Sequence, residues 1–443
     1  MARLFGTDGI RGVFGDDLTT ELARSLGSAA VAVLGRDVRE APSFLIGRDT
    51  RTSGPFLEEA MVEGILAGGG HVIRAGIVPT PAVAFLTTEL GVSCGVVISA
   101  SHNTPDYNGI KFFGSRGFKL PDLLEEEIEA ALLAGDGVTG ARGSEITPRS
   151  SAPSYADHVV SAAGTRLEGM RLVVDCANGA ASGFAPDVLG RLGADVVAIN
   201  ADGAGSAINS GCGALFPEVV AAAVLAHGAD AGVAHDGDAD RTLFSDVAGN
   251  VIDGDQVLAA SAIAMQRAGT LTGEAVAATV MSNLGFHRAM AEHGIRVIST
   301  AVGDRYVLEG MLEHDLALGG EQSGHVIFRE HATTGDGLIT AVRFLSLAAE
   351  KGVTLAEVAA AMRRFPQVLV NVEVVDKERL EHAEMIWAEV RAREARLDGM
   401  GRLLVRASGT EPLVRVMVEA ETEEVAREHA DAIAAVVATE LNR

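Results

Sequence analysis

Cysteine is scarce in this chain of 443 residues, which contains only Cys94, Cys176 and Cys212. They form no C-x-x-C pair and no even set, so the pattern argues against a disulfide framework and against a zinc site. Scarce and unpaired cysteine is typical of proteins from a reducing compartment. We therefore expect a cytoplasmic protein.

Basic residues are also few, because 36 lysines and arginines stand against 60 aspartates and glutamates, giving a formal net charge of −24. Such an acidic chain is not expected to bind nucleic acid or an anionic membrane surface. It also lacks any apolar run of membrane-spanning length, and its N-terminus lacks the pattern of a signal peptide. If this protein binds phosphate, it must gather its arginines and lysines locally.

The first segment with potentially reactive side chains covers residues 99–111. It follows an apolar run at 95–98 that predicts a buried strand. It places Ser101 and His102 on a loop just past a strand end, with Lys111 later in the same segment. A nucleophilic hydroxyl, a titratable ring and an ammonium group suit covalent catalysis. The alternative is an ordinary turn, since turns use the same polar residues.

The second segment contains Asp236, Asp238 and Asp240, followed by Arg241, and it also comes after an apolar run. Carboxylates at alternate positions can converge on one hard cation. The segment is not an EF-hand loop, because Arg241 stands where that loop needs glycine and Val247 where it needs glutamate. An open site of three carboxylates suits Mg²⁺, and the alternative is a solvated acidic turn.

A third segment, residues 319–325, follows the apolar run 316–318 and carries Glu321, Gln322, Ser323 and His325. Carboxylate, amide and hydroxyl groups on a glycine-containing loop can bind sugar hydroxyls or amines. This signal is weak by itself, since the same residues are common in loops without a ligand.

A fourth segment combines two guanidinium groups, two hydroxyls and a glycine that exposes backbone N–H groups, which together can cradle a phosphate. Its residues are Arg406, Ser408, Gly409, Thr410 and Arg415.

An internal repeat organises most of the chain. A strand, a helix and a second strand recur with a glycine near the helix C-terminus, as in βαβ units. The copies are expected at 44–46, 56–67 and 71–73, at 172–174, 184–192 and 196–199, and at 275–280, 286–292 and 297–298. In each copy the next apolar strand leads into one of the first three segments. Because ligands bind at loops after the carboxyl ends of such strands, the repeat favours a shared site.

The C-terminal part breaks this pattern. Alternation at Val368, Val370, Val372 and Val374 predicts a half-exposed strand. A helix at 377–396, strands at 403–405 and 414–418 and a helix from about 423 follow, which indicates an α+β domain. We expect four domains, at 1–150, 151–250, 251–365 and 366–443.

These four segments, in this order and spacing, resemble the α-D-phosphohexomutase family over essentially the whole chain. The resemblance implies an α/β fold of three tandem similar domains plus a C-terminal α+β domain, arranged around a central cleft. Within the family, residues 5–12, 302–307 and 320–325 are similar to the branch that acts on glucosamine phosphates. Mannose- and glucose-phosphate mutases usually carry a different residue where Gln322 stands.

The resemblance implies a role for each segment. Ser101 would carry a phosphoryl group, and its phosphate would join the three aspartates as a ligand of one Mg²⁺. Arg11, His102, Lys111 and Arg241 would line the reacting end, with Lys111 the first choice for proton transfer. The remaining residues would bind substrate: Glu321 and Ser323 the sugar hydroxyls, and Arg406, Ser408, Gly409, Thr410 and Arg415 the non-reacting phosphate. His325 would bind substrate or serve as a structural histidine.

The implied reaction interconverts glucosamine 6-phosphate and glucosamine 1-phosphate through a bisphosphorylated sugar. A hexose 1,6-bisphosphate would prime the serine, and the product would feed UDP-N-acetylglucosamine and cell-wall precursor synthesis. Its partners would be small sugar phosphates, and a homodimer is expected from the family. Three alternatives stay open: a mutase acting on mannose or glucose phosphates, a serine-dependent sugar phosphatase, and a non-catalytic sugar-phosphate sensor.

Two departures from the family pattern affect loops. The usual S-H-N-P-x-x-D-N-G-I-K loop has Thr104 in the proline position, Pro105 after it and Tyr107 in place of the aspartate. The spacing is kept, so Ser101 and Lys111 should remain in place, although proline fixes φ one residue later. In the second domain, Leu215 and Phe216 stand where related enzymes usually have Thr-His, which we interpret as a structural change.

Overall fold

The fold is described from a computed structural model that covers residues 4–6, 8–36, 40–135, 142–146, 154–408 and 412–442. The chain divides into two compact units, one of residues 1–281 and 294–361 and the other of residues 282–293 and 362–443. Each unit is described by itself.

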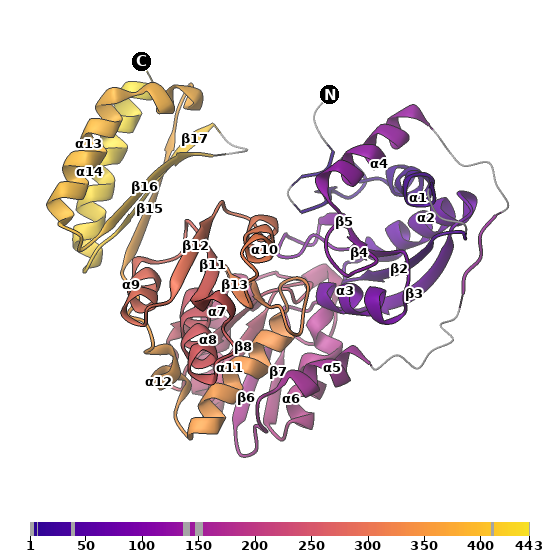
Figure 1. Ribbon diagram of the computed structural model, residues 1–443, viewed down its shortest axis with the longest axis horizontal. Helices are drawn as coiled ribbons and strands as arrows, with labels where there is room; N and C mark the ends of the chain where they lie inside the picture. Colours follow the sequence, from indigo (N-terminus) through magenta and orange to yellow (C-terminus); the bar gives the residue numbers. More distant parts are fainter. Residues whose placement is uncertain are drawn as a thin grey trace. The chain divides into compact units, whose positions relative to one another are not determined.

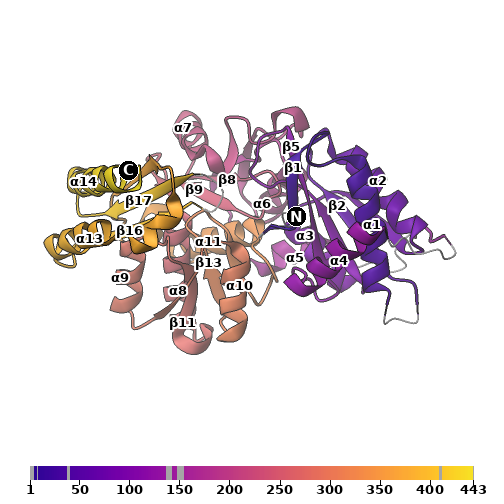
Figure 2. The same ribbon diagram turned by 90° about the horizontal axis from the view of Figure 1, so that it is seen from above.

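The first sheet of the larger unit has the strand order β1-β5-β4-β2-β3. Helices α1, α2 and α4 cover the face that carries Phe44, Ile46 and Val96, whereas α3 packs on the other face through Val83 (Figure 2). The elements are β1 (Ile10–Val13), α1 (Thr20–Leu34), β2 (Ser43–Arg48), α2 (Gly54–Ala67), β3 (His71–Ile77), α3 (Thr80–Glu89), β4 (Cys94–Ile98), β5 (Tyr107–Gly114) and α4 (Asp122–Ala134).

The second sheet has the order β10-β9-β8-β6-β7 and repeats the arrangement of the first. Its central strand β8 is buried along its whole length, as a strand covered on both faces must be. The elements are α5 (Tyr155–Ala162), β6 (Arg171–Asp175), α6 (Ala185–Arg191), β7 (Asp195–Ile199), α7 (Pro217–His227), β8 (Ala231–His235), β9 (Thr242–Ser245) and β10 (Val251–Ile252).

The third sheet has the order β12-β11-β13-β14. Two helices beside it begin at side-chain caps, α8 at a capping box formed by Asp253 and Gln256 and α11 at Asp336. The elements are α8 (Gly254–Ala268), β11 (Ala275–Thr279), β12 (Arg296–Thr300), α10 (Asp304–Glu313), β13 (Leu318–Gly320), β14 (Val326–Phe328), α11 (Gly337–Lys351) and α12 (Leu355–Ala359).

The smaller unit is an antiparallel sheet of order β15-β17-β16, with α13 and α14 packed on one face (Figure 1). Helix α9, which the sequence analysis places in the third domain, belongs to this unit. The elements are α9 (Leu284–Glu292), β15 (Gln367–Glu373), the 3-10 helix η5 (Lys377–His382), α13 (Glu384–Leu397), β16 (Arg402–Ala407), β17 (Leu413–Glu419) and α14 (Glu423–Leu441).

The predicted repeat is confirmed, because the first and second strand of each copy pair in parallel: β2 with β3, β6 with β7 and β11 with β12. The next strand of each copy, β4, β8 or β13, then pairs on the other side of the first strand. Each of these three strands continues into an antiparallel partner, so the three predicted segments lie in equivalent turns.

Two predicted element boundaries are wrong. Gly319 and Gly320 belong to strand β13 and not to the loop after it, because they pair with Ile327 and Val326. The helix expected at 377–396 is broken at Ala383, whose ψ of 80° is not helical, so a 3-10 helix precedes α13. The boundary expected near 150 falls in 147–153, outside the described residues.

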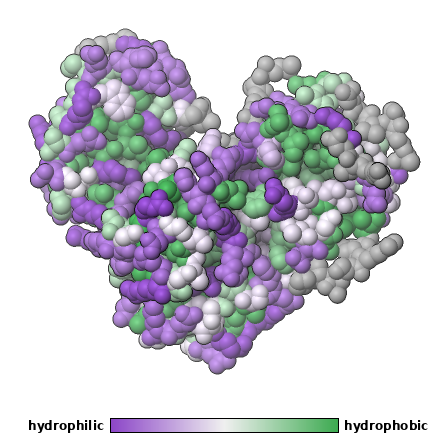
Figure 3. Space-filling view, viewed as in Figure 1, coloured by the Kyte–Doolittle hydropathy of each residue, from purple (hydrophilic) through white to green (hydrophobic). Residues whose placement is uncertain are grey.

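Hydrophilic residues cover much of the face drawn in Figure 3, with apolar residues scattered between them. Among the helices that the structure describes, none is both long enough and apolar enough to cross a membrane.

Candidate active site

The turns that follow β4, β8 and β13 lie together in the larger unit. The backbone N–H of Thr80 donates to the carbonyl of Asp238 at 2.9 Å, and that of Thr242 donates to the carbonyl of Gly324 at 3.1 Å. These contacts tie the first domain and the third segment to the aspartate turn. Loops from equivalent strand ends therefore form one site, as expected for open α/β sheets.

Ser101 lies at the centre of this site and is buried. Its hydroxyl donates to Oδ2 of Asp236 at 2.7 Å, and Nδ1 of His102 lies 3.2 Å from the serine Oγ. Its backbone has a φ of 51°, in the left-handed region that few residues other than glycine adopt. The serine is thus held beside a carboxylate in an uncommon backbone conformation, which is typical of functional sites.

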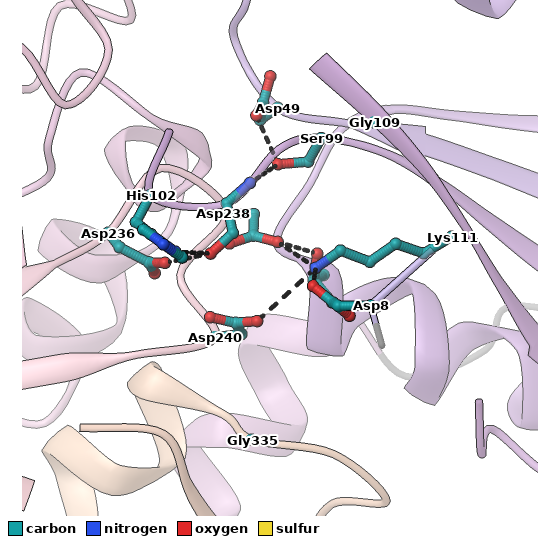
Figure 4. A network of polar contacts seen from close by, with 12 residues as sticks. Asp8, Asp49, Ser99, His102, Gly109, Lys111, Asp236, Asp238, Asp240 and Gly335 are labelled. Carbon is teal, nitrogen blue, oxygen red and sulfur yellow. Dashed lines mark hydrogen bonds and ion pairs between the residues drawn. The ribbon is translucent and has the colours of Figure 1, made fainter. Parts of the chain in front are cut away.

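The three aspartates of the second segment converge, as Figure 4 shows. Asp236, Asp238 and Asp240 are all buried, and one carboxylate oxygen of each lies within 4.8 Å of the others. Burial, and then the two neighbouring carboxylates, raise the pKa of Asp236 well above its usual range. Burial and the charge of Asp238 raise the pKa of Asp240 in the same way. Three carboxylates this close repel one another unless a cation lies between them.

The donor set fits a hard divalent cation. Among the described residues, the Oδ1 atoms of Asp238 and Asp240 are buried and accept no hydrogen bond. Leaving a buried acceptor unpaired costs free energy, so these two oxygens suit the role of cation ligands. An all-oxygen set with room for a phosphate oxygen suits Mg²⁺ better than a transition metal.

Lys111, on β5, points into the same site (Figure 4). Its Nζ lies 2.8 Å from Oδ2 of Asp8, 3.3 Å from Oδ2 of Asp238 and 3.9 Å from Oδ2 of Asp240. Burial lowers the pKa of the Lys111 ammonium, but Asp238, Asp8 and Asp240 raise it further, so the net shift is well upward. The lysine is therefore held charged.

Cationic and neutral side chains surround the serine. Arg11, on β1, donates to Oδ1 of Asn103 at 3.2 Å and also contacts Asp8. The backbone N–H of Arg241 donates to Oδ1 of Asp236 at 3.2 Å. Burial, followed by the charges of Arg241 and Arg11, lowers the pKa of His102 to about 3. The His102 ring is consequently neutral at pH 7, so the positive charge near the serine comes from Arg11, Arg241 and Lys111.

The third segment contributes Glu321, Ser323 and His325. Oε1 of Glu321 accepts the N–H of Gly303 at 3.2 Å, and the buried Oγ of Ser323 has no partner among the described residues. Nε2 of the buried His325 accepts the N–H of Gly335 at 3.2 Å. A neutral His325 therefore carries its proton on Nδ1, which has no partner within the described part of the chain.

The side chain of Gln322 contacts a helix cap. Its Nε2 donates to Oδ2 of Asp253 at 3.4 Å, and Asp253 caps helix α8. From the sequence, Gln322 is the residue expected to indicate the sugar preference. In the structure, its side chain contacts the capped end of a helix.

The fourth segment lies in the smaller unit. Arg406 on β16 and Arg415 on β17 are directly opposite each other in the antiparallel ladder. Burial, and then the charge of Arg415, lowers the pKa of Arg406. Like charges at opposed positions destabilise a strand pair, so an anion bound between them would be favoured. The N–H of Ser408 donates to the carbonyl of Leu413 at 2.8 Å, whereas Gly409 and Thr410 lie outside the described residues.

A group of charged residues beside the site was not predicted from the sequence. Lys119 contacts both Asp8 and Asp304, and Oδ2 of Asp304 lies 3.8 Å from Nε2 of His325. Burial raises the pKa of Asp304, but the charge and hydrogen bond of Lys119 together with His325 lower it further, so the net shift of this pKa is downward. Asp8 and Asp304 stand in segments that the sequence analysis quotes, 5–12 and 302–307, yet no spacing rule links them to Lys119.

The polar residues at the end of β2 were also not predicted, although the adjacency of β2 and β4 points to them. Asp49 and Arg51 follow the end of β2, which neighbours β4, so their loop must lie beside the serine turn. Thr80, at the start of α3, donates from its hydroxyl to Oδ2 of Asp238 at 2.6 Å. Asn209, in the second domain, donates to the carbonyl of Ser101 at 2.8 Å.

The chain was compared with protein-family models and with known proteins. Models of phosphoglucomutase/phosphomannomutase match it along nearly its whole length: alpha/beta/alpha domain I at residues 2–138, domain II at 153–249, domain III at 253–365 and the C-terminal domain at 369–436.

Similar full-length proteins include phosphoglucosamine mutases from two bacteria. The protein from Frankia alni is 52% identical over 448 residues, with 99% of this chain and 98% of that protein covered. The protein from Thermobifida fusca is also 52% identical over 448 residues, covering 100% of this chain and 99% of that one. Among solved structures, a phosphoglucomutase/phosphomannomutase family protein from Burkholderia thailandensis has a TM-score of 0.83 at 26% identity, covering 99% of this chain and 97% of that one.

Proposed function

Because the chain belongs to the phosphoglucomutase/phosphomannomutase family, we propose that it catalyses the phosphoglucosamine mutase reaction, which interconverts glucosamine 6-phosphate and glucosamine 1-phosphate. Two observations support this assignment. Full-length relatives at about half identity are phosphoglucosamine mutases. The observation that carries the chemistry is the buried hydroxyl of Ser101, 2.7 Å from one of three converging aspartates.

Ser101 is the phosphoryl carrier. Its phosphate passes to one hydroxyl of the bound hexose monophosphate: an O–P bond forms at the sugar as the serine O–P bond breaks, and the proton that the sugar hydroxyl loses balances the one that the serine oxygen takes up. The resulting bisphosphate then turns over, and its other phosphate returns to Ser101. Phosphoryl transfer of this kind depends on positioning and on charge stabilisation more than on covalent chemistry. A hexose 1,6-bisphosphate would supply the first phosphoryl group.

Asp236, Asp238 and Asp240, together with an oxygen of the serine phosphate, would hold one Mg²⁺. When bound, this ion would neutralise the charge on the transferring phosphoryl group. The orphaned oxygens of Asp238 and Asp240 support this ligand set. Arg241 and Arg11 provide the remaining positive charge around the phosphoryl oxygens.

Lys111 donates the proton that the departing serine oxygen or sugar oxygen requires. Its ammonium is buried among carboxylates that keep it charged, which suits a proton donor better than a base. The proton on Nδ1 of His325 is free for a sugar oxygen, and Glu321 accepts from the sugar hydroxyls. His325 therefore belongs with the substrate-binding residues Glu321 and Ser323.

The non-reacting phosphate is bound by the fourth segment. Arg406 and Arg415 form a pair of like charges that an anion would relieve. Ser408, Gly409 and Thr410 would add hydroxyl and backbone N–H donors. A separate phosphate site of this kind favours a mutase over a phosphatase, because hydrolysis needs only one phosphate site.

A mutase specific for glucose or mannose phosphates is the second candidate. The contact between Gln322 and Asp253 removes one reason to exclude it, since the Gln322 side chain faces a helix cap. Sugar preference therefore rests on the similarity to the phosphoglucosamine mutases.

The test is a coupled mutase assay with Mg²⁺ and a hexose 1,6-bisphosphate, run on glucosamine, glucose and mannose phosphates in parallel. We expect kcat/KM for glucosamine phosphate to be higher by about tenfold or more, a difference of about 1.4 kcal/mol in transition-state binding. Ser101→Ala should abolish turnover, whereas Ser115→Ala, at an exposed turn, should not. Preference for another sugar would overturn the substrate, and release of free phosphate would overturn the mutase assignment.

A further inference from the structure

Arg51 is an arginine with no exposed surface that none of the proposed catalytic or binding roles uses. It follows strand β2, beside the turn that carries Ser101. A buried guanidinium is costly unless it is paired and every N–H group finds an acceptor. Its partners therefore identify what it holds in place.

All of its partners apart from one carboxylate lie in the serine turn. Nη2 donates to the carbonyl of Ser101 at 3.0 Å and to that of Asn103 at 2.8 Å. Nη1 donates to the carbonyl of Tyr107 at 2.9 Å and also to that of Thr104. Nε donates to Oδ2 of Asp49 at 3.0 Å. A guanidinium has five N–H groups in a fixed plane, so this set uses all of them.

The same arginine reaches the backbone of Ser101 by a second route. Oδ2 of Asp49 accepts the hydroxyl proton of Ser99 at 2.6 Å, and Oγ of Ser99 accepts the N–H of Ser101 at 2.9 Å. The carbonyl and the N–H of Ser101 are therefore both fixed from Arg51, one directly and one through Asp49 and Ser99. Between these two bonds, Ser101 has its positive φ of 51°.

The two positions at which this turn differs from the family loop also contact Arg51. Thr104 and Tyr107, which replace the usual proline and aspartate of the family loop, both present their carbonyls to Arg51. Asn209 adds donors to the carbonyls of Ser101 at 2.8 Å and Asn103 at 2.9 Å. A planar set of donors fixes the relative positions of four carbonyls, which a lysine ammonium with three donors cannot do.

We propose that Arg51 is a positioning residue for phosphoryl transfer: it holds the turn so that the Ser101 hydroxyl faces the aspartates and the sugar. This inference rests on the proposed mutase function. A displacement of about 1 Å at a reacting group can cost about 100-fold in rate. Arg51 donates to none of the three aspartates and to none of the residues proposed to bind substrate, so its loss should lower kcat and leave substrate binding largely intact.

The test compares Arg51→Lys with Arg48→Lys. Arg48 ends the same strand, but its Nε is bound to Glu58 at 2.8 Å and its Nη1 to the carbonyl of Asp49 at 3.3 Å, and neither bond reaches the serine turn. We expect Arg51→Lys to lower kcat by about 100-fold with KM for glucosamine 1-phosphate changed by less than about threefold. The rate at which a hexose 1,6-bisphosphate phosphorylates dephosphorylated Ser101, measured by intact-protein mass spectrometry, should fall by a similar factor. Arg48→Lys should match the wild type in each measurement.

Ser99→Ala is the second variant, in case Arg51→Lys does not fold. It removes only the link between Asp49 and the Ser101 N–H, and it should slow the same phosphorylation step without raising KM. Normal kcat in either folded variant, or a rise in KM alone, would overturn the proposal. An inactive wild-type chain would instead overturn the mutase function, so the two failures are distinct.

Discussion

Nζ of Lys111 lies 2.8 Å from Oδ2 of Asp8, and Asp8 also contacts Lys119. Asp8 thus shares its carboxylate between two buried ammonium groups. Burial raises the pKa of Asp8, but Lys111 and Lys119 lower it further, so this carboxylate stays ionised. Asp8 and Lys111 therefore form a buried ion pair beside Asp238.

Asp8→Asn should lower kcat by about 100-fold, because it removes a carboxylate that keeps the proposed proton donor in place and charged. The charge of Asp8 raises the pKa of Lys111, so its removal should shift the alkaline limb of the kcat/KM profile to lower pH. The measurement is a pH–rate profile of the variant. Asp16→Asn, at an exposed turn, is the control, and an unchanged profile in Asp8→Asn would contradict the assigned role of Lys111.

Asp240→Asn should raise the thermal stability of the metal-free protein. Burial and the charge of Asp238 raise the pKa of Asp240, so its ionised form is disfavoured until a cation binds. The wild type should gain about 2.7 kcal/mol at a Mg²⁺ concentration 100 times the Kd, and the variant should gain little. Scanning calorimetry with EDTA and then with Mg²⁺ measures both effects. Glu218→Gln, exposed at the start of α7, should respond as the wild type does.

Asp336 should make stability depend on pH between about 4 and about 6. Burial, partly offset by the N–H of Ile339 and the hydroxyl of Tyr155, raises its pKa to about 6. Because the folded pKa lies above the unfolded value of about 3.9, the folded state binds more protons in this window, and stability falls as pH rises through it. Relative to Asp336→Asn, the wild type should lose about 3 kcal/mol of unfolding free energy across the window.

Urea unfolding of both proteins at several pH values measures that difference. Tyr155→Phe provides an internal check, because its hydroxyl lies 2.8 Å from each oxygen of Asp336 and stabilises the ionised form. Its removal should move the window to higher pH. A difference between wild type and Asp336→Asn that stays constant with pH would show that folding does not raise the pKa of Asp336.

Arg415→Ala should raise KM by about tenfold or more and change kcat little. A charged hydrogen bond to phosphate is worth about 1.5–3 kcal/mol, and a non-reacting phosphate held at the proposed site would be bound equally in the ground state and the transition state. Steady-state kinetics of the variant separate the two parameters. Arg427→Ala, which removes an exposed partner of Glu423 on α14, is the control. An equal fall in kcat at unchanged KM would place Arg415 at the reacting end instead.

The strand-ending segments could be predicted because each follows an apolar run in a repeated βαβ pattern. Chain order alone places Ser101, Asp236 and Glu321 in equivalent turns, and β4, β8 and β13 confirm this equivalence. The helix at 377–396 could not be predicted correctly, because Ala383, with a ψ of 80°, separates the 3-10 turn at 377–382 from α13. Neither a glycine nor a proline stands at this break, so the sequence carries no signal for it.

Contacts across domains were beyond sequence reasoning for a different reason. Lys119 and Asp304 are far apart in the chain and meet only because the first and third sheets bring their loops together. Arg51 carries no motif of its own, and its importance depends on the positions of four carbonyl oxygens. Backbone acceptors leave no trace in residue identity, so a positioning residue of this type emerges only from coordinates.

Gly335→Ala should inactivate the enzyme through His325. The N–H of Gly335 donates to Nε2 of His325, and a Cβ at position 335 would lie 2.3 Å from the ring atoms Cδ2 and Nε2. The ring would have to move, which would displace a side chain proposed to bind the substrate, so kcat should fall by about 100-fold. Kinetics, with nitrogen NMR of the His325 tautomer, test this directly. Gly190→Ala in α6, where a Cβ meets nothing within 4 Å, should keep full activity and stabilise the helix by up to about 1 kcal/mol. Full activity in Gly335→Ala would mean that the orientation of His325 is immaterial to the reaction.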